Sequence, residues 1–124
     1  MIDSKFIDSS VWVAYITKKL FSDVVDTEGN LAISVLSIFE IKRKLLREGL
    51  SEHEIESILL LVKNRCSFIF PVTLELAEKA AGIAQKNNLA TVDSIIYTTA
   101  MEEGMQLFTS DNDFRGLKGA VVLG

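Results

Sequence analysis

Four acidic residues stand beside apolar runs, where a charge contributes little to folding. They are Asp8, Glu40, Asp93 and Asp111. Carboxylates held close together repel one another, and they stay ionised together only if a cation neutralises them. Oxygen ligands favour Mg²⁺ or Mn²⁺, whereas zinc prefers His and Cys. Such ions activate water and stabilise the leaving oxygen of a phosphodiester. The four acids are therefore a candidate metal site for phosphodiester chemistry.

Short apolar segments alternate with helical patterns along the chain and must position these acids. Strands are expected at residues 4–7, 31–34, 67–70, 106–109 and 120–123. Helices are expected at residues 9–19, 38–48, 73–87 and 91–103. A further helix is expected to begin at Ser51, which forms a capping-box pattern with Glu54. Strands that alternate with helices in this way predict a parallel sheet covered on both faces.

The predicted sheet gives the acids a common location. In such sheets, ligands bind at the carboxyl ends of the strands, near the switch in strand order. Asp8 would end the first strand, and Asp111 would lie just past the fourth. Asp93 would lie in the first turn of a helix capped by Thr91, where the helix dipole favours an anion. Glu40 would lie near the start of its own helix, at the same edge of the sheet.

Each acid also has a purely structural explanation. Asp93 could serve only the helix dipole, and Asp111 could be an ordinary turn residue. Glu40 could be a solvated acid that pairs with Lys44 four residues later. Asp8 could cap the helix that follows it. All four explanations would have to hold together, which weighs against them.

Length and composition bound the class of protein. The 124 residues predict a single domain over residues 1–124, and no apolar run approaches a membrane span. No signal peptide is recognisable, and the single Cys66 suits a reducing cytoplasm. The net charge of −4 does not by itself indicate nucleic-acid binding, although acids that surround a metal contribute to this negative charge. The 48% hydrophobic content suggests that some apolar surface packs against a second chain, with Trp12 and Tyr15 as core or dimer contacts.

Four segments in order resemble the successive motifs of PIN domains, and the group they resemble most is the VapC-type toxins of prokaryotic toxin–antitoxin pairs. These segments are Phe6–Val11, Ser37–Ile41, Asp93–Ala100 and Leu107–Phe114. The resemblance covers nearly the whole chain. It implies a three-layer α/β/α sandwich with a parallel sheet of about five strands. It also implies a Mg²⁺- or Mn²⁺-dependent ribonuclease that cuts single-stranded or loop RNA.

The same resemblance implies roles for particular residues and partners. The metal ligands and catalytic acids would be Asp8, Glu40, Asp93 and Asp111. Asp113 would be a supporting acid, and Thr109 would place a hydroxyl near Asp111. Members of the family commonly form homodimers and are silenced by an antitoxin. One departure is Ser9, which stands where Thr is frequent.

Basic residues raise the question of how RNA would be held. A basic run comprises Lys42, Arg43, Lys44 and Arg47. Arg43 and the others could contact phosphate, seat an acidic partner segment, or simply form a solvated face. Arg115, just after the Asp111 motif, is the better candidate for an RNA contact near the chemistry. The rival function is a catalytically silent PIN-fold module that binds a partner, which complete acids argue against but do not exclude.

Overall fold

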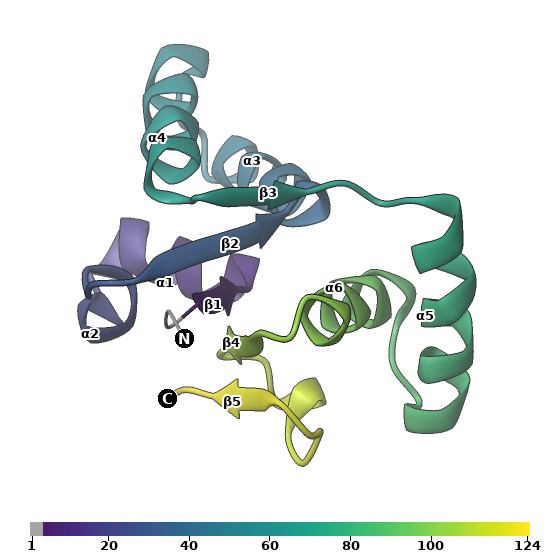
Figure 1. Cartoon of the computed structure of the whole chain (residues 1–124). Coiled ribbons are helices and arrows are strands. Elements are labelled where there is room, and N and C mark those ends of the chain that lie inside the picture. Colours follow the sequence, from purple (N-terminus) through teal and green to yellow (C-terminus); the bar gives the residue numbers. More distant parts are fainter. Residues whose placement is uncertain (1–3) are drawn as a thin grey trace.

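The computed structural model describes residues 4–124 and contains one parallel sheet (Figure 1). Its strands are β1 (Ser4–Ile7), β2 (Asn30–Ser34), β3 (Phe68–Phe70), β4 (Gln106–Thr109) and β5 (Ala120–Val122). The strand order is β3-β2-β1-β4-β5. The chain therefore builds outward from β1 to β3 and then returns to the other side of β1, which makes the β1–β4 pair the switch point of the sheet.

Seven helical segments connect the strands within residues 4–124. They are α1 (Ser9–Lys18), α2 (Ser22–Val25), α3 (Val35–Arg47), α4 (Glu52–Arg65), α5 (Leu74–Asn87), α6 (Thr91–Glu102) and the 3₁₀ turn η1 (Asn112–Phe114). Hydroxyl side chains begin three of them, as expected for N-caps. Ser34 accepts the Leu36 N–H at 3.1 Å, Thr73 caps α5, and Ser51 forms the predicted capping box with Glu54.

Alternation along the strands divides the interior into two cores. Ile7 faces a core formed with α1, α2, α3 and α4, and this core contains the fully buried Trp12. The preceding residue, Phe6, faces a second core formed with α6 and η1. Since successive strand residues point to opposite faces, the central strand β1 is buried on both sides, whereas the edge strand β3 is partly exposed. The predicted three-layer α/β/α sandwich around a parallel five-stranded sheet is confirmed.

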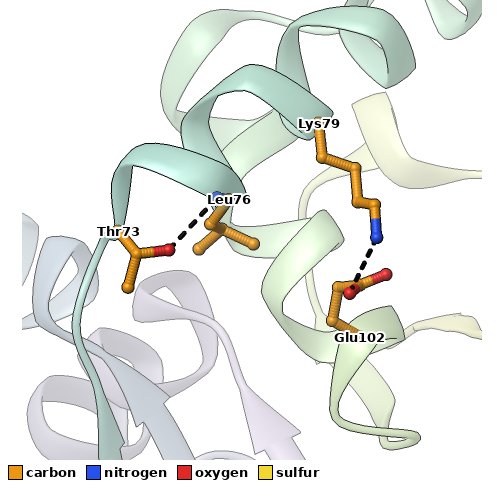
Figure 2. A network of polar contacts seen from close by, with 4 residues as sticks. All are labelled: Thr73, Leu76, Lys79 and Glu102. Atoms are coloured by element: carbon orange, nitrogen blue, oxygen red, sulfur yellow. Dashed lines mark hydrogen bonds and ion pairs between the residues drawn. The ribbon is translucent and has the colours of Figure 1, made fainter.

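Helix α5 lies outside α6, at the margin of the molecule (Figure 1). Ala80 is its one buried residue, and Leu74 at its start is 80% exposed. Figure 2 shows two polar contacts of the helix: Thr73 accepts the Leu76 N–H at 3.1 Å within α5, and Lys79 reaches Glu102 of α6 at 3.0 Å. α5 thus contributes little to either core.

Two expectations from the sequence were wrong in detail, and one short helix was missed. Thr91 does not cap α6, because Ala90 occupies the N-cap and Thr91 is the first helical residue. α3 begins three residues early, since Ser34 caps it directly at the end of β2. The short α2 was not anticipated; it starts after Phe21, which adopts a left-handed backbone conformation with φ of 62°. Among the described residues, no helix is both long and apolar enough to cross a membrane.

Candidate metal centre

The acids converge where β1 and β4 end side by side. Asp8 directly follows β1, and its N–H donates to the Phe108 carbonyl of β4 at 2.9 Å. Asp111 lies just beyond β4 and begins η1. Asp93 is in the first turn of α6, and Glu40 is in the second turn of α3. The charges of Asp111, Asp8, Glu40 and Asp113 all raise the pKa of Asp93, so the five acids share one electrostatic environment.

Asp8 is the innermost acid and is held by hydroxyl groups. Its side chain is 4% exposed, and its Oδ2 accepts hydrogen bonds from Ser10 and Thr109, each at 2.8 Å. Burial raises the pKa of Asp8, and these two hydrogen bonds oppose that rise. The Thr109 hydroxyl also accepts the Asp111 N–H at 3.0 Å, and Ser10 accepts the Ser110 N–H at 3.0 Å. The hydroxyls therefore join the end of β1 to the turn after β4.

Asp93, Asp111 and Asp113 form a tighter group at the rim of the site. One carboxylate oxygen from each lies within 4.8 Å of the others. The Asp113 N–H donates to Asp111 Oδ1 at 2.9 Å, which orders the turn. Burial, followed by the charge of Asp111, raises the pKa of Asp93 to about 6. A set of three carboxylates that repel one another has the donor chemistry that Mg²⁺ or Mn²⁺ requires.

The group of three differs from the ligand set expected from the sequence. Asp113 was expected only as a supporting acid, yet one of its carboxylate oxygens lies within 4.8 Å of carboxylate oxygens of Asp93 and Asp111. Asp8 and Glu40 are not part of this group, although both repel Asp93. The assignment of individual residues as metal ligands stays a prediction.

Glu40 points to the site and not to the helix surface. It is half-buried, and its Oε1 accepts the Ser9 hydroxyl at 2.9 Å. Burial is the main reason that the pKa of Glu40 is raised, and the charges of Asp8 and Asp111 add to it. Lys44, the alternative partner, instead forms an exposed ion pair with Glu48 at 3.8 Å. Glu40 is therefore oriented by α1 and not by its own helix.

The two arginines proposed for RNA contact have different surroundings. Arg43 lines an open groove of about 300 Å³ between α1 and α3, which reaches Glu40 and Ser10. Arg115 follows η1, and its guanidinium donates two hydrogen bonds to Asn112 Oδ1, at 2.7 and 3.2 Å. Thus Arg43 shares a groove with an acid of the site, whereas Arg115 is held by the turn that carries Asp111 and Asp113.

The sequence reasoning did not assign Ser9 and Ser10 to the site, yet both touch its acids. A signal was present in their position: two hydroxyl residues directly follow Asp8 and open α1 at the carboxyl edge of the sheet. Hydroxyl groups in the first turn of such a helix are well placed to donate to neighbouring carboxylates.

The similarity of this chain to known proteins lies at the level of the whole fold. The family model of the PIN domain matches residues 5–120. No curated protein sequence matches the chain. A toxin–antitoxin complex from Klebsiella pneumoniae is similar in structure, with a TM-score of 0.78 and 20% identity over 95% of this chain and 96% of that one.

Two further solved structures are similar over nearly their full lengths. VapBC2 from Rickettsia felis, bound to a DNA fragment from its promoter, has a TM-score of 0.73 and 15% identity, with 97% of each chain covered. VapC20 from Mycobacterium tuberculosis, a Sarcin-Ricin loop cleaving toxin, has a TM-score of 0.71 and 17% identity over 92% of this chain and 95% of that one. At these identities the likeness shows a shared fold. Because the family model spans nearly every element that brings the acids together, the chain belongs to the PIN-domain family.

Proposed function

We propose that this protein is a metal-dependent endoribonuclease that cleaves RNA phosphodiester bonds. The observation that carries the proposal is the meeting of Asp93, Asp111 and Asp113 within 4.8 Å at the switch point of a PIN domain. The charges of Asp111 and Asp113 add to burial in raising the pKa of Asp93, and a divalent cation would relieve this repulsion. Similarity to the Sarcin-Ricin loop cleaving toxin supports RNA as the substrate class.

The residues divide into those that hold a cation and those that orient them. Asp93, Asp111 and Asp113 would hold Mg²⁺ or Mn²⁺, with Asp8 and Glu40 as direct ligands or through water. When bound, such an ion activates water and stabilises the departing oxygen. The Ser10 and Thr109 hydroxyls keep the Asp8 carboxylate turned in one direction. Arg115, fixed by Asn112, is suitably placed to contact a phosphate near the turn.

The biological setting that we propose is a toxin–antitoxin pair acting in the cytoplasm. Several structural relatives are toxin–antitoxin complexes, which supports an antitoxin partner. Exposed apolar side chains on α3 and α4 offer a surface for a protein partner or for a second copy of the chain. They are Phe39 (62% exposed), Leu46 (50%), Leu60 (57%) and Leu61 (53%). The proposed homodimer is tested by light scattering of the purified protein, which should give the molar mass of a dimer.

Cleavage of a mixed, structured RNA in the presence of Mn²⁺ tests the activity. We expect Asp8→Asn to reduce cleavage by at least about a hundredfold, as for loss of other groups that stabilise transition-state charge. A chelator should abolish it. Asp23→Asn is the matched control, because Asp23 is an exposed acid on α2, which precedes β2 and lies away from the carboxyl ends of the strands. Full activity of Asp8→Asn would refute the site assignment.

The catalytically silent module is separated from the enzyme by metal binding. The exposed apolar residues of α3 and α4 would serve such a module equally well. Calorimetric titration with Mn²⁺ should give binding that Asp8→Asn weakens and Asp23→Asn does not. Stable capture of a partner by a wild-type protein that binds no Mn²⁺ and cuts no RNA would favour the module.

A further inference from the structure

The groove between α1 and α3 combines acidic and basic groups in an ordered way. Its end nearest the candidate metal centre is formed by Ser9, Ser10 and Glu40. Its other end is formed by cations of α3, namely Arg43, Lys44 and Arg47. The groove is therefore continuous with the acids and becomes basic as it leaves them.

Helix geometry explains why these cations face the groove. Arg43 and Arg47 are four residues apart and so lie on one face of α3. With a rise of 1.5 Å per residue, Arg43 is about 4.5 Å and Arg47 about 10 Å beyond Glu40 along the helix. Lys42 is exposed on the same helix but does not line the groove. Lys44 is partly engaged by Glu48, which leaves the two arginines as the main positive charges of the groove.

We propose that this groove binds the RNA backbone beside the scissile phosphate, with Arg43 and Arg47 each contacting a flanking phosphate. The inference rests on the proposed nuclease function and adds the direction in which the strand leaves the acids. Arginine suits this role because its planar guanidinium donates two parallel hydrogen bonds to phosphate. Arg115 is held by Asn112 at the turn that follows β4, so it would contact a different part of the strand.

Charge complementarity favours RNA over an acidic protein segment as the occupant. Glu40 lines the end of the groove nearest the other acids, so an occupant that fills the groove lies against this carboxylate. Carboxylates of a protein segment would add repulsion there. A phosphate of the substrate would share a Mg²⁺ ion with the protein carboxylates, which is how this ion is usually bound. The basic end of the groove would then hold the next phosphates of the same strand.

The test measures RNA affinity as a function of salt in the inactive Asp8→Asn background. The probe is a fluorescent single-stranded RNA of mixed sequence and 12 nucleotides, titrated with protein in Mg²⁺ between about 50 and 200 mM salt. We compare Arg43→Gln and Arg47→Gln with Lys42→Gln, which removes the same charge from the same helix outside the groove. The slope of log K against log salt is negative, and each arginine variant should make it shallower by about 0.7, the value for one single-strand phosphate. Lys42→Gln should leave the slope unchanged.

The outcomes separate this proposal from the function on which it rests. The slopes could be equal for the Arg43→Gln, Arg47→Gln and Lys42→Gln variants while the wild type still cleaves RNA. This result would overturn only the proposal that the groove binds RNA, and it would favour an acidic protein segment as the occupant. A wild type that neither cleaves nor binds RNA would overturn both. Far-ultraviolet circular dichroism confirms that each variant is folded, and all three substitutions are at exposed helix positions that should tolerate them.

Discussion

The inner and outer acids of the site have different neighbours. Asp8 is 4% exposed and accepts hydrogen bonds from Ser10 and Thr109, so the chain itself supplies groups that favour its charge. Burial nevertheless raises the pKa of Asp8. Asp93, Asp111 and Asp113 lie at the rim with carboxylate oxygens within 4.8 Å of one another, and the charges of Asp111 and Asp113 add to burial in raising the pKa of Asp93. This difference indicates that the hydroxyl groups of the interior fix the geometry, whereas the positive charge of a cation at the rim would relieve the repulsion there.

The largest effect should come from supplying that charge. Mn²⁺ at 100 times its dissociation constant should raise the free energy of unfolding by about 2.7 kcal/mol, because it binds only the folded site. Asp93→Asn and Asp113→Asn should each lose most of this gain, as measured by urea unfolding with and without Mn²⁺. The exposed Asp23→Asn should keep it. A full Mn²⁺ effect in Asp113→Asn would return Asp113 to a supporting role.

The hydroxyl side of the comparison is tested by Thr109→Val. Thr109 is fully buried, and its hydroxyl serves both Asp8 and the Asp111 N–H. Removing it leaves buried groups unsatisfied, at a cost of about 1–3 kcal/mol in urea unfolding. Thr98→Val is the matched control, because within residues 4–124 the buried Thr98 hydroxyl has no hydrogen-bond partner. That change should be neutral or stabilising, and equal losses in both variants would refute the argument.

The pH dependence of the metal-free protein should reveal the raised pKa of Asp93, which burial causes first and the charges of neighbouring acids second. The pKa of Asp93 is about 6 in the folded protein and 3.8 ordinarily, so between these values the folded state binds more protons than the unfolded state. Stability should therefore fall as the pH rises from about 4 to about 6, and then level off. Asp93→Asn should flatten this slope in unfolding experiments with chelator. A wild-type stability that rises across the same window would contradict the raised pKa of Asp93.

The smallest effect should come from Ser9, whose hydroxyl donates to Glu40 at 2.9 Å. Ser9→Ala removes one hydrogen bond from a half-buried carboxylate and should lower kcat/KM for RNA cleavage by roughly two- to tenfold. Ser9→Thr keeps the hydroxyl and should restore the rate. Failure of Thr to rescue would mean that the loss in Ser9→Ala comes from packing and not from the orientation of Glu40.

The fold was largely predictable because its signals are local. β1 and β4 have the bounds expected from their apolar segments, and Ser51 with Glu54 marks the start of α4. The short α2 was not predictable, since Phe21 adopts a left-handed conformation without the Gly or Asn that usually indicates one. The start of α6 was misjudged because Ala90 supplies no side-chain oxygen to its N-cap.

The convergence of the four acids was predictable from the sequence, but the contacts that orient them were not. Asp8, Glu40, Asp93 and Asp111 share one electrostatic environment, as the strand ends suggested. The hydrogen bond from Thr109 to Asp8 joins positions 101 residues apart, and the sequence does not encode such a contact in any local pattern. The same holds for the link between Ser9 and Glu40, which depends on how α1 packs against α3.

The pairing of β1 with β4 has a consequence for the order of synthesis. During synthesis, β1 is made about a hundred residues before its partner strand β4, as the 101-residue separation of Asp8 and Thr109 shows. At elongation rates of about 5–20 residues per second, the chain is without this neighbour for at least about five seconds. Asp111 and Asp113 are synthesised after Thr109, so a nascent chain cannot bring the acids together until more than about a hundred residues after Asp8 have been made. The candidate metal centre would therefore form only late in the translation of this domain.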